Sequence, residues 1–132
     1  MSNSETGTGV EARVGSLEID GSFDQERYLI KWNGVEVLLT GKSFKYLTKL
    51  AHRKKHGRSG WIYKEDIEPG FNQAKYIYRM NNELRNILGD DVPALKSNKL
   101  GYYQLGVDSD QISFNEENLK KYPDWEIRNL FS

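Results

Sequence analysis

Two histidines, His52 and His56, come nearest in type and spacing to a metal site. They stand four residues apart, a spacing that places two imidazoles on one face of a helix. Arg53, Lys54 and Lys55 lie between them, and the sequence has no cysteine and no third histidine. Because cationic neighbours repel a metal ion and two ligands do not complete a site, we expect no bound metal and no other cofactor.

Two pairs of adjacent carboxylates, Glu65-Asp66 and Asp90-Asp91, are the next residues suited to acid–base chemistry. General acid–base catalysis needs a partner, such as a histidine or a nucleophile, in a recognisable arrangement with the carboxylate. Neither pair has one, and a helix start and a solvated turn explain both. We therefore expect no enzymatic activity, no catalytic residue and no small-molecule substrate.

Positive charge is concentrated in the middle of the chain. The net charge is zero, yet residues 42–103 carry thirteen Lys and Arg against six Asp and Glu. Residues 1–41 carry three against seven, and residues 104–132 carry three against six. A basic central region is typical of a surface that meets phosphates. The alternative is a mixed, solvated surface on which these charges cluster by chance.

The length and composition are those of one small globular domain. A chain of 132 residues with 37% hydrophobic and 29% charged residues can bury one ordinary core. No apolar run approaches the roughly 18 residues that cross a bilayer, so we expect no membrane segment. The polar residues 1–15 are expected to form a flexible leader without a secretory signal. The lack of cysteine suits a cytoplasmic protein.

Short strands are predicted from residue 16 to residue 40. Two β-branched and aromatic runs flank Asn33-Gly34, the strongest short signal for a β-hairpin. Gly21-Ser22 is predicted as an earlier turn. These features indicate a small antiparallel sheet.

Two helices are predicted next. Thr40 precedes apolar residues at helical spacing, which predicts a helix over 41–55 with Thr40 as its N-cap. A short helix is predicted over 64–68, ended by Pro69-Gly70.

A third helix, over residues 73–88, has the clearest pattern in the sequence. Ile77, Met80, Leu84 and Ile87 or Leu88 recur at three- and four-residue steps, which predicts one apolar stripe on a helix that ends at Gly89. That stripe is expected to pack on the domain and to leave the opposite side of the helix exposed.

The exposed side of this third helix carries side chains that can read DNA bases. Lys75, Arg79 and Asn82 are spaced i, i+4, i+7, with Gln73 at the helix entry and Tyr78 alongside. Arginine can bond guanine O6 and N7 with two hydrogen bonds, and Asn or Gln can do the same for adenine. The alternative is that these residues only solvate an exposed helix.

A β-hairpin with a basic tip is predicted over residues 94–105. Two lysines flank two small polar residues at its tip, in the order Lys96, Ser97, Asn98, Lys99. Such a tip can lie over phosphates or a narrow minor groove, although any exposed turn uses similar residues. Tyr102 and Tyr103 face opposite sides of a strand, so one is expected in the core and the other at the surface.

In their order and spacing, these elements resemble the OmpR/PhoB-type winged-helix DNA-binding domain over about residues 16–107. The resemblance is carried by Leu39-Thr40 with Phe44 and Leu47, by Ile77, Met80 and Leu84, and by Gly101-Tyr102 with Leu105. It implies an α+β winged helix-turn-helix fold, with an N-terminal antiparallel sheet, three helices and a C-terminal hairpin called the wing. It also implies that the third helix enters the major groove and that the wing touches the minor groove or backbone.

The chain departs from that family at three positions. The family usually has an acidic residue where Ser43 stands, an arginine where Asn81 stands, and a lysine or arginine near Glu83. The receiver domain that often accompanies the family is also absent from these 132 residues.

Residues 108–132 form an acidic C-terminal extension with a short helix predicted near 115–121. It ends in an apolar patch of Trp125, Ile127, Leu130 and Phe131, which either packs on the domain or docks a partner. We predict sequence-specific binding of double-stranded DNA by a bacterial-type transcriptional regulator, with RNA polymerase or another protein as an additional candidate partner. The alternative is a protein-interaction module that uses the third helix or this patch.

Overall fold

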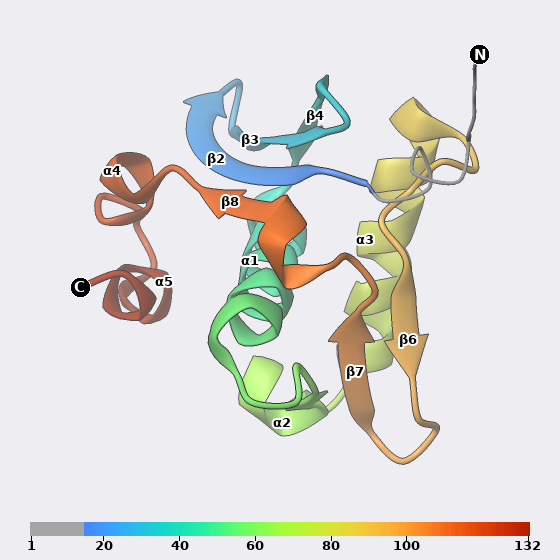
Figure 1. Ribbon diagram of the computed structural model, residues 1–132. Coiled ribbons are helices and arrows are strands. Elements are labelled where there is room, and N and C mark those ends of the chain that lie inside the picture. Colours follow the sequence, from blue (N-terminus) through green and yellow to red (C-terminus); the bar gives the residue numbers. More distant parts are fainter. Residues whose placement is uncertain (1–14) are drawn as a thin grey trace.

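The computed structural model describes residues 15–132 and shows a mixed α+β fold with two sheets (Figure 1). The elements are β2 (Leu17–Asp24), β3 (Arg27–Trp32), β4 (Val35–Leu39), α1 (Gly41–His56), β5 (Ile62–Tyr63), α2 (Lys64–Ile67), α3 (Gln73–Leu88), β6 (Leu95–Ser97), β7 (Tyr102–Leu105), the 3₁₀ turn η2 (Ser109–Gln111), β8 (Ile112–Phe114), α4 (Glu116–Leu119) and α5 (Trp125–Leu130). The leader predicted over residues 1–15 falls almost entirely outside the described residues. Within residues 15–132, every helix is too short or too polar to cross a lipid bilayer.

The N-terminal strands form a four-stranded sheet in the order β4-β3-β2-β8. The Asn33-Gly34 hairpin is confirmed, because β3 and β4 pair antiparallel on either side of it. The turn predicted at Gly21-Ser22 is wrong: both residues lie within β2, where the pairing register with β3 shifts. Instead, the chain turns at Gln25 and Glu26, which have left-handed φ angles of 51° and 64°.

The second sheet is three-stranded, in the order β5-β7-β6. Strands β6 and β7 form the predicted hairpin, and β5 extends it by pairing Ile62 with Tyr103. The backbone of Lys64 also donates a hydrogen bond of 2.8 Å to the carbonyl of Gly101. The hairpin is therefore fixed to the segment between α1 and α2.

The three central helices lie close to their predicted bounds. Helix α1 begins after Thr40, and α3 begins at Gln73 and ends at Gly89, whose φ of 65° lets the chain leave the helix. Asn72 precedes α3 with a left-handed φ of 76°, which turns the chain between α2 and α3. Thr40 stands at the predicted N-cap position of α1, but its side chain makes no cap hydrogen bond to its own helix.

The first turn of α1 is capped by a residue of α3. The Glu83 carboxylate accepts hydrogen bonds from the Thr40 amide at 2.9 Å and from the Thr40 and Ser43 hydroxyls at 2.8 Å each. Arg27 lies 4.0 Å from the same carboxylate. A negative group at a helix N-terminus satisfies free amides and complements the helix dipole. This contact therefore fixes α3 relative to α1.

The C-terminal extension is built into the fold. Strand β8 pairs parallel with β2, so residues far apart in the sequence lie side by side (Figure 1). Ile127 and Phe131 are buried in the core and Leu130 packs against it, whereas Trp125 is 63% exposed. Of the predicted apolar patch, only Trp125 remains available to a partner.

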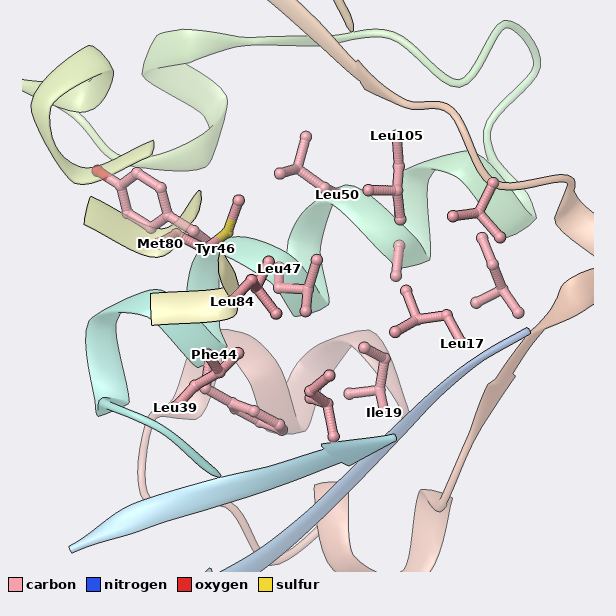
Figure 2. Close-up of a cluster of buried hydrophobic side chains, with 14 of the residues drawn as sticks. Leu17, Ile19, Leu39, Phe44, Tyr46, Leu47, Leu50, Met80, Leu84 and Leu105 are labelled. Atoms are coloured by element: carbon pink, nitrogen blue, oxygen red, sulfur yellow. The ribbon is translucent and has the colours of Figure 1, made fainter. Parts of the chain in front are cut away.

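One hydrophobic core joins both sheets and the helices. Figure 2 shows side chains from α1, α3 and β7 meeting those of the four-stranded sheet. Labelled members are Leu17, Ile19, Leu39, Phe44, Tyr46, Leu47, Leu50, Met80, Leu84 and Leu105. The apolar stripe predicted for α3 is confirmed at Ile77, Met80 and Leu84, which are buried, and at Leu88, which packs against the core, whereas Ile87 is 59% exposed.

Replacing the capping carboxylate is expected to destabilise the whole fold. Glu83→Ala removes three hydrogen bonds to a charged group and leaves the first turn of α1 uncapped, so we expect a loss of about 2 to 3 kcal/mol in the free energy of unfolding. Glu117→Ala removes an exposed glutamate and should change it by less than about 0.5 kcal/mol. Urea unfolding followed by circular dichroism measures both. Equal effects of the two substitutions would contradict the capping role.

The docking of α5 on α1 is expected to weaken as the pH falls. Hydrogen bonds from Lys45 and then Lys49 lower the pKa of Glu126 below its usual 4.5. Burial, and then the charge of His56, lowers the pKa of His52 below 6.5. Both groups titrate at lower pH in the folded chain than in the unfolded chain. Their stabilising contributions are therefore complete above the unfolded pKa values and lost as the pH decreases.

We expect the thermal midpoint to fall in two steps, the first below about pH 6.5 and the second below about pH 4.5. His52→Gln should remove the first step and Glu126→Gln should reduce the second. Differential scanning calorimetry from about pH 8 to about pH 2.5 measures these changes. A midpoint that stays constant between about pH 7 and pH 5 would exclude the contribution of His52.

Candidate nucleic-acid interface

Helix α3 presents one polar, exposed face. Lys75, Tyr78, Arg79, Arg85 and Asn86 are exposed, and Tyr78 is 67% accessible. At 3.6 residues per turn, these positions share the side of the helix opposite the buried apolar stripe. Asn82 lies on the same side and is half-buried. Four of the five predicted helix residues, Lys75, Tyr78, Arg79 and Asn82, are thus brought together.

Gln73 is the exception among the predicted helix residues. Its side chain is only 3% exposed, and its amide nitrogen donates hydrogen bonds to the carbonyls of Glu68 and Gly70. These bonds tie the start of α3 to the end of α2. Gln73 therefore holds the helix entry in place, and its prediction as a base-reading residue is corrected.

The cations of α3 pair with no carboxylate among residues 15–132. Within the part of the chain that the structure describes, Lys75, Arg79 and Arg85 form no ion pair. Three cations of α1 behave differently: Lys42 pairs with Glu68, Lys45 pairs with Asp124 and Glu126, and Lys49 pairs with Glu126. The basic central region therefore divides into cations that serve the fold and cations that face outward.

The hairpin tip between β6 and β7 is held in shape by the small polar residues predicted to contact DNA. The side-chain oxygen of Asn98 accepts hydrogen bonds from the amides of Leu100 and Tyr102, at 2.7 and 3.1 Å. The Ser97 hydroxyl accepts one from the Lys99 amide at 3.1 Å. Ser97 and Asn98 therefore form the turn, and their oxygen atoms are already engaged.

Two lysines and one leucine project from this tip. Lys96, Lys99 and Leu100 are exposed, and Leu100 is 76% accessible. Lys99 has a left-handed φ of 66°, a conformation that the two side-chain hydrogen bonds of the turn support. The two tyrosines divide as predicted, with Tyr102 at the surface and Tyr103 packed against the core.

A cleft of about 450 Å³ separates the start of α3 from the hairpin. Lys99 of the hairpin, Lys64 and Glu65 of α2, and Asn72 and Ala74 at the start of α3 line it. Phe71, which is 89% exposed, also borders it. The helix and the hairpin tip therefore bound one continuous concave surface that carries lysines.

Sequence reasoning missed Lys64, which lines the cleft, and three exposed residues outside it, namely Arg85 and Asn86 on α3 and Leu100 at the hairpin tip. Arg85 and Asn86 extend the i, i+3, i+4 series of α3 by one turn, so the periodicity alone contained the signal. Lys64 had no such signal, because its place beside the hairpin follows from the pairing of β5 with β7.

The two histidines pack as aromatic rings. The His52 and His56 ring centroids are 4.7 Å apart, and His52 lies 5.4 Å from Phe131. Across residues 15–132, no group of three or more potential metal-ligating side chains (His, Cys, Asp or Glu) is close enough to hold a metal ion.

Comparisons with protein-family models, with curated proteins and with solved structures give no match to this chain. Function must therefore be inferred from the geometry and charge of the surface formed by α3 and the hairpin.

Loss of the Asn98 side chain is expected to loosen the hairpin tip alone. Asn98→Ala removes the acceptor for the Leu100 and Tyr102 amides, so both amides should exchange with deuterium about tenfold faster. Asn98→Asp keeps an acceptor oxygen and should preserve their protection. Amide exchange measured by NMR tests this, with the buried Leu84 amide as an internal reference. Unchanged exchange in Asn98→Ala would contradict the role of Asn98 in the turn.

Proposed function

We propose that this protein binds double-stranded DNA in a sequence-specific manner through α3 and the β6–β7 hairpin. One observation carries the proposal: α3 buries Ile77, Met80 and Leu84, and its opposite face exposes cations that form no ion pair among residues 15–132, beside a lysine-bearing hairpin. In this proposal the arrangement is a winged helix-turn-helix, in which α2 and α3 form the helix-turn-helix and the hairpin is the wing. The protein would then act on DNA as a transcriptional regulator in the cytoplasm.

The dimensions of α3 suit the major groove. With 16 residues, α3 is about 24 Å long, and the groove of B-DNA is about 12 Å wide and admits one α-helix. In such a docking, Arg79 and Asn82 face the base edges, because they lie in the middle of the exposed face. Arg79 can discriminate guanine, and Asn82 can discriminate adenine.

The outward cations supply the contacts to the DNA backbone. Lys64 and Lys99 line the cleft between helix and hairpin, and Lys75 lies one turn into α3. The free amides at the start of a helix also favour a phosphate, and Asn72 makes no side-chain cap that would occupy them. These contacts carry affinity without sequence preference, whereas Arg79 and Asn82 carry the preference.

A protein partner at the same face is the second candidate function. It is favoured by two exposed aromatic side chains next to α3, Phe71 and Tyr78, which are 89% and 67% accessible. Aromatic residues are enriched at the centres of protein interfaces. The C-terminal patch does not support this function, because Ile127 and Phe131 are buried.

Salt dependence separates the two functions. If about five lysines and arginines meet phosphates, the logarithm of the DNA affinity should fall with the logarithm of salt concentration with a slope of about −4. Fluorescence anisotropy with a labelled random duplex, from about 50 to 200 mM salt, measures this slope. A slope near zero, or no binding at low salt, would refute the DNA proposal and favour a protein partner.

Two substitutions distinguish a residue that gives sequence preference from one that gives general affinity for DNA. Arg79→Ala should lower the preference for a duplex selected from a random pool over a scrambled duplex by roughly tenfold or more. Lys99→Ala should weaken binding to both duplexes alike and reduce the salt slope by about 1. Lys120→Ala, an exposed lysine next to α4, is the matched control and should change neither quantity. An equal loss on both duplexes for Arg79→Ala would contradict its base-reading role.

A further inference from the structure

We infer that Tyr76 is a positioning residue that orients the Arg79 guanidinium for base reading. This inference rests on the proposed function, since it names the residue on which sequence preference depends. Tyr76 and Arg79 are three residues apart on α3, so their side chains meet on adjacent turns. The central carbon of the Arg79 guanidinium lies 5.3 Å from the centre of the Tyr76 ring.

The Tyr76 ring is held in place by its contact with the Tyr46 ring of α1. It is half-buried, and its centroid is 6.0 Å from that of Tyr46 in an edge-to-face arrangement. Tyr46 is completely buried in α1, and its hydroxyl donates a 2.7 Å hydrogen bond to Glu68. A rigid ring beside a flexible arginine reduces the number of rotamers that the arginine samples, because the cation is attracted to the ring face.

A second cation, Lys42, also lies over the Tyr76 ring, but its charge is balanced by the carboxylate of Glu68. The Lys42 ammonium lies 4.4 Å from the Tyr76 centroid and donates a 2.8 Å hydrogen bond to Glu68. Glu68 has a lowered pKa even though its partial burial opposes this, because Lys42 and then Tyr46 donate hydrogen bonds to its carboxylate. Glu68 therefore stays ionised and balances Lys42, so Arg79 is the cation on this ring with no carboxylate partner among residues 15–132.

The contact with Tyr76 leaves the donors of Arg79 available. The attraction of a guanidinium to an aromatic ring uses its charge and its flat face, whereas its five N–H donors point outward in the guanidinium plane. Arg79 donates no hydrogen bond within the described part of the chain. The side chain is thus oriented before it meets DNA and keeps the paired donors that guanine requires.

The orientation can be measured without DNA. In the DNA-free protein, we expect the Arg79 Nε–Hε group to show a strongly positive heteronuclear NOE in wild type and in Tyr76→Phe, which retains the ring. Tyr76→Leu should reduce it to the value of Arg85, an arginine of the same helix. Tyr78→Leu removes an aromatic ring that makes no cation–π contact among residues 15–132 and should leave the Arg79 NOE unchanged. Equal mobility of Arg79 in wild type and Tyr76→Leu would overturn the inference, even if the protein proves to bind no DNA.

A double-mutant cycle of Tyr76 and Arg79 measures how Tyr76 affects the preference for one DNA sequence over another. Tyr76→Leu should lower the preference for the selected duplex over the scrambled duplex by about two- to fivefold, the amount expected of one exposed cation–π contact. Tyr76→Phe should restore most of that preference. In an Arg79→Ala background, Tyr76→Leu should cost no further preference. Additive effects of the two substitutions would show that Tyr76 acts independently of Arg79 and would overturn the inference. An absence of DNA binding in wild type would instead contradict the proposed function.

Discussion

The carboxylate of Glu83 holds α3 against the first turn of α1, and the exposed face of α3 depends on that contact. It accepts hydrogen bonds from Thr40 and Ser43, while Met80 and Leu84 on either side of it enter the core. One charged group therefore satisfies the free end of α1 and sets the rotation of α3 about its own axis. A different rotation would expose apolar side chains and bury the cations, at a cost in both desolvation and lost packing.

Two of the three departures from the OmpR/PhoB-type pattern meet in this contact. The resemblance places an acidic residue on the first helix at position 43 and a basic residue near position 83. Here a serine and a glutamate stand at these places and are hydrogen bonded to each other. In this contact the carboxylate is on α3 and the hydroxyl groups come from Thr40 and Ser43 at the start of α1. The third departure, Asn81, lies beside the exposed face and is half-buried.

The cations of the basic central region have two different settings. Some pair with carboxylates of the fold, and others are exposed. Two cations of α1, Lys45 and Lys49, pair with carboxylates of the C-terminal extension, and a third, Lys42, pairs with Glu68. The acidic extension therefore neutralises one side of the basic region and leaves the charges of α3 and the hairpin uncompensated. This division gives a chain with no net charge a surface suited to a polyanion.

The sequence by itself determined the strands around Asn33-Gly34, the helices and the apolar stripe of α3, because each follows from a local period or turn preference. The outward series of Lys75, Arg79 and Asn82 followed from the same period. Only the tertiary structure decided that Gln73 is buried, that Asn98 forms its own turn, and that β8 pairs with β2. These features depend on the hydrogen-bond partners that folding supplies and, for β8, on a strand distant in the sequence, which no local pattern encodes.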